Sequence, residues 1–434
     1  MMAGAKRGYG EFKRGWPIVL SAMLGIGLGL SPVPFYTIGI FAPELARTFH
    51  WGFAQVMGGL PITTIAVFIA SPLVGMLSDR FGVRIVTLVS VALFGLSFMA
   101  FSFSNGSLTL FYINWGMMAL LGAGTLPITW TRAVNNAFDV RKGLALGLSL
   151  LGTGLFGYLV KPFAAALLVA WGWRAAYLVI GALPLVVALP VAFFGFHDVD
   201  ARESALARKA VLAERRAATP GLTFVQAIKN WRFWVLACAF VPISFAVGGP
   251  IPNMENILKI AHFAPKDIIA LASLIGLSVI GGRLVGGWLI DRIWAPAVAL
   301  VLIGAPAVAC WMLANGPLGY NVTALSIIMI GFAAGVEYDL MAFMPARYFG
   351  MRRYASIYGA LYGFFAAGAG IAPVIFGAAF DRSGSYAQPL MLSAALLLVG
   401  VALLLCLGRY RRFPAASAGA VSAAAEATAD TLPA

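Results

Sequence analysis

The fold of this chain is indicated by the stretch Gly75-Met-Leu-Ser-Asp79-Arg80-Phe-Gly82-Val-Arg84, which follows a long apolar run. A related stretch, Gly287-Trp-Leu-Ile-Asp291-Arg292, follows another apolar run in the second half of the chain. The two aspartates are 212 residues apart, about half of the 434-residue sequence. A helix–turn–helix joint repeated in two apolar halves is typical of a membrane transporter built from two related helical bundles.

The composition predicts a membrane protein. The chain is 61% hydrophobic and 11% charged, whereas a soluble domain is about half apolar and about a quarter charged. Many apolar runs reach the ~20 residues that a helix needs to cross a bilayer. We predict an all-α membrane protein with twelve transmembrane helices in two pseudo-symmetric six-helix bundles, at about residues 16–43, 54–77, 84–104, 108–137, 143–169, 174–196, 232–257, 267–289, 294–314, 320–346, 354–380 and 387–408.

The sequence between and after these bundles differs from them in composition. We predict an N-terminal bundle over residues 1–196 and a C-terminal bundle over 231–412. Residues 197–230 are rich in Ala, Arg, Lys and Glu, which predicts a cytoplasmic linker with an amphipathic helix. Residues 413–434 are poor in bulky side chains and are expected to be a disordered cytoplasmic tail.

The charge distribution predicts the orientation. Of the 30 Lys and Arg residues, 22 fall in segments that lie on one side of the membrane in this layout. Because positive residues accumulate on the cytoplasmic side, both termini are expected in the cytoplasm. The same asymmetry explains the net charge of +14 without nucleic acid as a partner.

Catalytic and metal chemistry find no support in the sequence. The three cysteines lie in apolar runs, and the three histidines show no metal-ligand spacing. No Gly-x-x-x-x-Gly-Lys-Ser/Thr loop for ATP occurs. We expect no enzyme activity, no metal and no cofactor, so that transport would be driven by gradients.

The stretch from Gly75 to Arg84 resembles the signature of the major facilitator superfamily, and the stretch from Gly287 to Arg292 resembles its degenerate copy. Within that superfamily, further stretches resemble the monocarboxylate and oxalate–formate porter group, in a bacterial branch. These are Arg141-Lys-Gly-Leu-Ala-Leu-Gly147, Gly172-Trp-Arg174-x-Ala-Tyr177 and Gly335-Val-Glu337-Tyr-Asp339-Leu. The resemblance implies a multi-pass protein of the bacterial inner membrane that transports small organic acids, often with a proton.

Charged residues within the apolar runs are candidate site residues, because each costs at least ~2.5 kcal/mol on insertion scales. Arg283 lies about eight residues before Asp291, so ~12 Å from the turn at 1.5 Å per residue. Its planar guanidinium matches a carboxylate in two hydrogen bonds. We predict that Arg283 anchors a substrate carboxylate; the alternative is a structural ion pair with Glu337 or Asp339.

Glu337 and Asp339 are candidates for proton coupling. They are two residues apart on one helix and therefore point in different directions. A buried carboxyl group can hold a proton near neutral pH. Either residue would serve as the coupling acid, and a purely structural role for the pair remains the alternative.

Four kinds of residue complete the predicted substrate site. Lys161 would attract an anion or extend to the outer surface, and Arg132 would contact substrate or form a structural pair. Polar groups of Tyr36, Asn253 and Tyr358 would contact the substrate, or their side chains would serve packing alone. Among Arg132, Lys161, Arg283, Glu337 and Asp339, positive charges exceed negative ones by one, which favours an anionic substrate.

The repeated stretches supply a predicted conformational gate. Asp79 would sit near the amino end of a neighbouring helix or pair with an arginine, and this contact would form in one state and break in the other. The alternative is a solvated turn charge. The gate residues are Gly75, Asp79, Arg80, Arg84, Asp291 and Arg292.

These features predict a secondary active transporter that moves a small organic anion, a carboxylate, by alternating access with proton symport. The alternative is an exporter of drugs or other hydrophobic compounds by proton antiport in the same fold. The expected partners are a small organic acid, a proton and membrane lipid. The protein is expected to function as a monomer.

Overall fold

The computed structural model describes residues 2–138, 142–196, 221–316, 318–350 and 352–410. Most of the predicted linker and all of the predicted tail at 413–434 lie outside these residues. The described residues are helical apart from turns and one isolated antiparallel bridge between Gly221 and Gly350. The all-helical prediction is therefore confirmed for the described part of the chain.

The first half of the chain contains nine α-helices and three short helical turns among its described residues. They are α1 (Met2–Gly27), α2 (Val33–Phe49), α3 (Phe53–Met57), α4 (Gly59–Phe81), α5 (Val83–Met99), η1 (Ala100–Phe103), α6 (Leu108–Gly122), η2 (Ala123–Thr125), α7 (Pro127–Ala137), α8 (Lys142–Leu183), η3 (Pro184–Ala188) and α9 (Leu189–Gly195).

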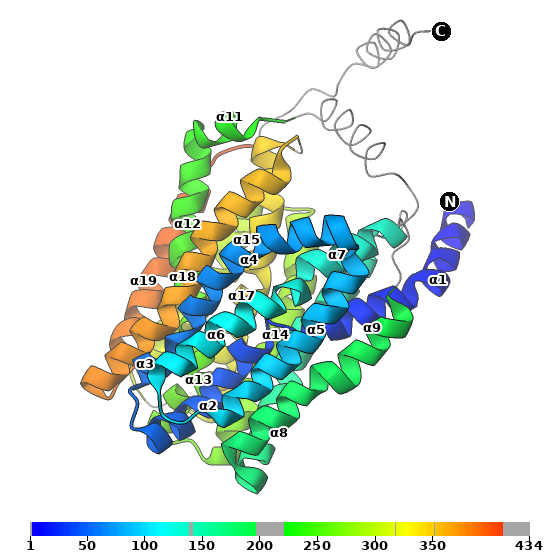
Figure 1. Cartoon of the computed structure of the whole chain (residues 1–434). Helices are drawn as coiled ribbons and strands as arrows, with labels where there is room; N and C mark the ends of the chain where they lie inside the picture. Colours follow the sequence, from blue (N-terminus) through cyan, green and yellow to red (C-terminus); the bar gives the residue numbers. More distant parts are fainter. Residues whose placement is uncertain (1, 139–141, 197–220, 317, 351, 411–434) are drawn as a thin grey trace, which may run out of the picture.

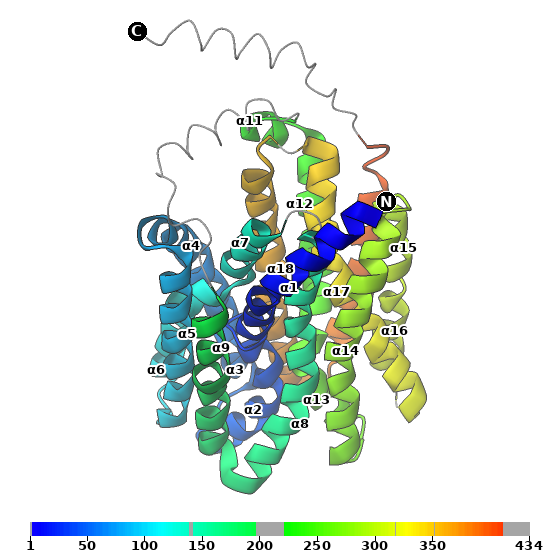
Figure 2. The ribbon, with the colours of Figure 1, turned by 90° about the vertical axis from the view of Figure 1, so that its right-hand side faces the viewer.

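The second half continues with the same architecture. Its helices are α11 (Phe224–Ile228), α12 (Trp231–Gly248), α13 (Pro250–Ile260), α14 (Pro265–Ile290), α15 (Ala295–Leu302), α16 (Pro306–Ala314), α17 (Tyr320–Phe349), α18 (Tyr354–Ser383) and α19 (Ala387–Leu405). Figure 2 shows α4, α5 and α6 on one side of the molecule and α14, α15 and α16 on the other.

Ten helical segments of the described residues are long and apolar enough to cross a membrane. One of them, Ala145–Gly195, has 51 residues and turns back at Gly172, where φ is 77°, so it crosses twice (Figure 1). Helices α1 and α2 together form a further, broken crossing. The described residues thus account for the twelve predicted crossings.

Several of the predicted continuous spans are interrupted in the structure, and two of these interruptions lie beside a Pro-x-Pro sequence. The span 16–43 is interrupted between α1 and α2, and the span 232–257 is interrupted at Gly249. Each break precedes a Pro-x-Pro sequence, Pro32-Val-Pro34 or Pro250-Ile-Pro252, because proline cannot continue the helical hydrogen bonds of the residues before it. At the first break the Leu30 amide donates to Thr125 Oγ1 at 2.9 Å, so the protein satisfies the exposed backbone internally.

The two ends of the molecule can be distinguished by the course of the chain. Helix α1 begins and helix α19 ends at one end, which we call the terminal end (Figure 1). The turn of α8 at Gly172 lies at the opposite end, which we call the distal end. The positive-inside pattern predicts that the terminal end faces the cytoplasm.

The two bundles meet along a seam in which α8 packs on α14, α2 packs on α13, and α3 and α4 pack on α18. Glycines permit this close approach: a Cβ atom at Gly154 would lie 2.7 Å from the Gly276 carbonyl oxygen. At the distal end the Asp381 carboxylate of α18 accepts hydrogen bonds from the Phe53 and Ala54 amides at 2.8 and 2.9 Å. The distal ends of the bundles are therefore held together.

Candidate functional site

Glycines bring α14 and α17 into close contact around Arg283. A Cβ atom at Gly335 on α17 would lie 2.9 Å from the Arg283 amide nitrogen on α14. A Cβ atom at Gly331 would lie 2.6 Å from Ser278 Cβ. Because only small residues permit such an approach, these glycines place Arg283 beside the segment that carries Glu337 and Asp339.

The Arg283 side chain is half-buried and has unused hydrogen-bonding capacity. Its Cζ lies 5.6 Å from the centroid of the Tyr338 ring, and its charge interacts with Glu337 and Asp339. However, Arg283 forms no ion pair with a carboxylate of the described residues, and its buried Nε has no hydrogen-bond partner. Since a guanidinium group has five N–H donors, Arg283 can still bind an acceptor.

The two acidic residues on α17 differ in exposure. Glu337 is buried, with 5% of its surface exposed, and its Oε2 has no hydrogen-bond partner among the residues that the structure describes. Asp339 is half-buried and faces α14, with Oδ2 4.0 Å from the position of a Cβ atom at Gly287. Both carboxylates lie close enough to interact with the charge of Arg283, so the structure gathers the predicted anchor and both predicted coupling acids in one cluster.

Tyrosines from both bundles complete this cluster. Tyr36 on α2 is buried against Gly157 of α8, and its hydroxyl group interacts electrostatically with Arg283 and Glu337. Tyr358 on α18 interacts electrostatically with Arg283 and Asp339. We call Tyr36, Arg283, Glu337, Asp339 and Tyr358 the central cluster.

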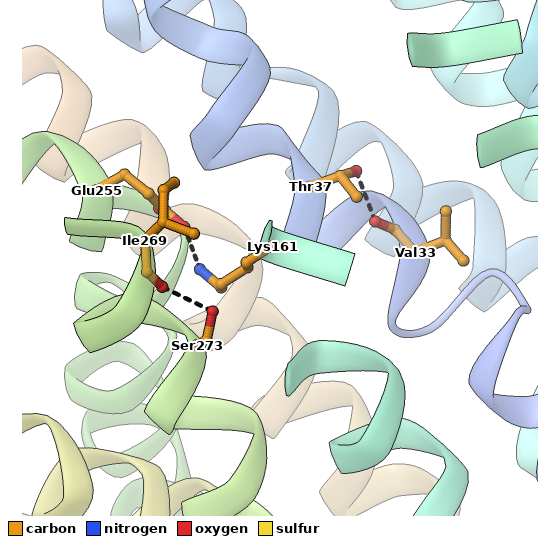
Figure 3. Close-up of polar contacts among 6 residues, drawn as sticks. All are labelled: Val33, Thr37, Lys161, Glu255, Ile269 and Ser273. Atoms are coloured by element: carbon orange, nitrogen blue, oxygen red, sulfur yellow. Dashed lines mark hydrogen bonds and ion pairs between the residues drawn. The ribbon is translucent and has the colours of Figure 1, made fainter. Parts of the chain in front are cut away.

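Lys161 lies in the distal half of the seam and is paired. Only 1% of its surface is exposed, and its Nζ donates to Glu255 Oε1 on α13 (Figure 3). Glu255 was not among the predicted site residues, although an acidic residue within the apolar run Trp231–Ile260 is detectable in the sequence. With Glu255 included, the intramembrane charges are three positive and three negative, so the predicted excess of one positive charge was wrong.

Asn253 takes part in a hydrogen-bond network beside the break at Gly249. Its Nδ2 donates to the Gly249 carbonyl at 2.9 Å, and its Oδ1 accepts from the Tyr386 hydroxyl at 3.3 Å. Asn256 Nδ2 donates to the same hydroxyl oxygen at 2.9 Å. These bonds fasten α13 to the start of α19, and the predicted contact of Asn253 with substrate stays a prediction.

The first predicted gate stretch is helical further than expected. Gly75 and Asp79 lie within α4, which continues to Phe81, and only Gly82 adopts a positive φ of 86°. Asp79 is thus in a helix rather than in the turn, because the turn needs a single glycine with left-handed freedom. The side chains of Asp79 and Arg132 lie outside the described part of the structure; Arg132 itself is in α7.

The other gate residues contact their own bundle. Arg84 donates to the Phe193 carbonyl at 2.6 Å, and Arg292 donates to the Trp288 carbonyl at 3.0 Å. Arg80 lies over the Phe81 ring at 5.3 Å, and the exposed Asp291 ends α14. By contrast, Asp381 and Lys161 form hydrogen bonds across the seam, and both residues lie in its distal half.

Twelve crossings in two bundles, with a polar cluster between the bundles, define a secondary transporter. Residues 24–373 match the sequence model of the Major Facilitator Superfamily. The chain belongs to this superfamily, which comprises transporters and not enzymes.

Several known proteins are similar to this chain. Human monocarboxylate transporter 11 is 26% identical over 89% of this chain and 82% of its own length. The probable sulfoacetate transporter SauU of Cupriavidus necator is 26% identical over 75% of this chain and 78% of its own. The crystal structure of a bacterial homologue of the human lysosomal transporter Spinster has a TM-score of 0.64 at 15% identity, covering 92% of this chain and 96% of that one. This structural likeness confirms the fold.

Proposed function

We propose that this secondary transporter moves a small organic anion with a carboxylate group, together with a proton, across the bacterial inner membrane. The terminal end would face the cytoplasm. The observation that supports this proposal most strongly is the half-buried Arg283, whose Nε has no hydrogen-bond partner and which forms no ion pair with the described carboxylates. A cation inside apolar helices is costly, and an anionic passenger would compensate it.

The groups around Arg283 suit a small carboxylate. The guanidinium fork offers two parallel N–H groups to the two carboxylate oxygens. The hydroxyl groups of Tyr36 and Tyr358 come from α2 and α18 and belong to opposite bundles. A passenger bound between them would contact both bundles, as an alternating-access mechanism requires.

The neighbouring acids supply a physical reason for proton coupling. With Glu337 and Asp339 both ionised, the three charges around Arg283 sum to minus one, and an incoming anion would be repelled. Protonation of one acid makes the cluster neutral, and protonation of both makes it positive. Protons therefore favour anion binding, which is the thermodynamic condition for symport.

The names of two relatives agree with this substrate class. Monocarboxylates and sulfoacetate are both anions with a carboxylate group, and the corresponding proteins align with most of this chain. At 26% identity these names support the class of solute and do not identify the acid.

Flux into liposomes tests the proposal. Purified protein is reconstituted, and uptake of labelled lactate, oxalate and sulfoacetate is measured with and without an acidic exterior. We expect an acidic exterior to drive uptake of at least one of them, and Arg283→Gln to abolish it, whereas the exposed Lys266→Gln on the same helix leaves it intact. Proton-driven movement of hydrophobic compounds, with no carboxylate flux, would instead support the drug exporter.

A further inference from the structure

The ion pair between Lys161 and Glu255 spans the seam between the two bundles. Lys161 belongs to α8 of the first bundle, and Glu255 belongs to α13 of the second (Figure 3). Their side chains are 1% and 7% exposed. Any movement that parts the distal halves of the bundles must therefore separate these two charges.

The Glu255 carboxylate lies in a narrow space between α2 and α8. A Cβ atom at Gly39 on α2 would lie 3.2 Å from Glu255 Cδ, so the carboxylate sits between Gly39 and Lys161. The second oxygen, Oε2, is buried and has no hydrogen-bond partner among the described residues. Lys161 is accordingly the main compensation for the buried negative charge while the distal side is closed.

A buried ion pair contributes little net free energy, because the loss of hydration offsets most of the attraction. Apolar side chains of similar size would close this part of the seam equally well or better. The two arrangements differ when the seam opens. Opening returns both charges to water, which hydrates them favourably, whereas it exposes apolar side chains to water at a cost.

We propose that the Lys161–Glu255 pair is a releasable distal gate, which closes the distal side without locking it. Hydration of the separated charges offsets the lost attraction, so the distal-closed and distal-open states stay near balance. Glu255 is in this sense a positioning residue for alternating access. The role does not depend on which solute the transporter carries.

Distances between the two distal tips test this gate. Spin labels are placed at Thr48 on α2 and at Lys266 on α14, both exposed at the distal end, after serine replaces Cys238, Cys310 and Cys406. Pulsed electron paramagnetic resonance then gives the populations of short and long distances. The native protein is expected to show both distances in comparable populations.

Two variants are expected to shift the balance in opposite directions. Glu255→Gln leaves a buried, unpaired ammonium in the closed state, so the long-distance population should rise by roughly a hundredfold or more relative to the short one. Lys161→Met combined with Glu255→Leu removes both charges, so the short distance should become the sole population. Exchange of the charges, Lys161→Glu with Glu255→Lys, should restore the native distribution.

The proposal is overturned if the apolar double variant shows the native distance distribution, because the pair would then only fill space. It is also overturned if Glu255→Gln stays closed or if the exchanged pair behaves like the single variant. Monodisperse gel filtration controls for folding. Failure of the apolar double variant to fold would show that the charges serve folding, and would count against the gate as well.

Discussion

Two cations within the apolar helices, Lys161 and Arg283, have different surroundings. Lys161 is almost fully buried and paired with Glu255 across the seam. Arg283 is half-buried and lies beside two acids; within the described part of the chain it forms no ion pair and its Nε has no hydrogen-bond partner. Glu255 compensates the first charge, whereas under the proposed function a transported anion compensates the second. An intramembrane cation therefore indicates a binding site only when its own chain leaves it unsatisfied.

The largest effect on transport is expected from substitution of Arg283. Arg283→Gln removes the charge and the donor fork, so initial uptake of the transported carboxylate should fall by roughly a hundredfold. Arg283→Lys keeps the charge without the fork and should recover only part of that loss. Initial uptake rates in liposomes measure both, with Lys266→Gln as the matched control. Equal uptake rates in Arg283→Gln and the parent would show that Arg283 does not bind the transported anion.

The second prediction concerns the acids beside Arg283. A one-to-one symporter accumulates its anion about tenfold per pH unit of gradient, because each tenfold ratio corresponds to about 1.4 kcal/mol. Glu337→Gln should remove this dependence while anion exchange continues, since a neutral amide cannot release a proton. Asp339 is less buried than Glu337, so Asp339→Asn should have the smaller effect on accumulation. Unchanged accumulation in both variants and in the double variant would rule out these acids as the coupling site.

A third prediction perturbs the paired cation through its neighbour. Gly39→Ala places a methyl group against Glu255, and overpacking of this kind costs about 1–3 kcal/mol. The distal-open population should therefore rise, as measured by the distances between Thr48 and Lys266 labels. A Cβ atom at Gly359 on α18 would lie within 4 Å of no atom in the described part of the chain, so Gly359→Ala serves as the control. Identical distance distributions in the two variants would show that Glu255 is not held at Gly39.

The smallest expected effect is at Tyr36, the residue that α2 contributes to the central cluster. Tyr36→Phe removes one hydroxyl group from the central cluster, and a neutral hydrogen bond contributes about 0.5–1.5 kcal/mol. The KM for the carboxylate should rise a few-fold with little change in maximal rate. Tyr112→Phe, whose hydroxyl donates to the Gln55 carbonyl within the first bundle, should leave KM unchanged. If Tyr36→Phe has the same KM as the parent, the Tyr36 hydroxyl group does not contact the substrate.

The sequence predicted the fold because apolar length and charge asymmetry are properties of single segments. It did not predict the helix breaks beside Pro32 and Pro250, because the apolar runs 16–43 and 232–257 continue through them. Glu255 was detectable as an acid within an apolar run, whereas its pairing with Lys161, 94 residues away in the other bundle, is visible only in the packed structure. Asp79 was expected in a turn, whereas the structure continues the helix to Phe81.

The sequence analysis raised contact of Arg283 with Glu337 or Asp339 only as the alternative to substrate binding, because all three residues lie within apolar runs. Whether these residues form an ion pair could not be predicted from the sequence. It depends on how closely α14 and α17 approach, which Gly282 and Gly335 permit in the folded structure. The hydrogen bond that Asn253 accepts from the Tyr386 hydroxyl likewise joins residues 133 positions apart.

Ligand-induced thermal stabilisation across a panel of carboxylates tests the central claim most directly. The purified parent should gain melting temperature with at least one small carboxylate, because a ligand that binds the folded state stabilises it. Arg283→Gln should lose that gain, and Lys266→Gln should keep it. Equal stabilisation of Arg283→Gln and the parent by every active compound would contradict the account, since the anion would then bind without this cation.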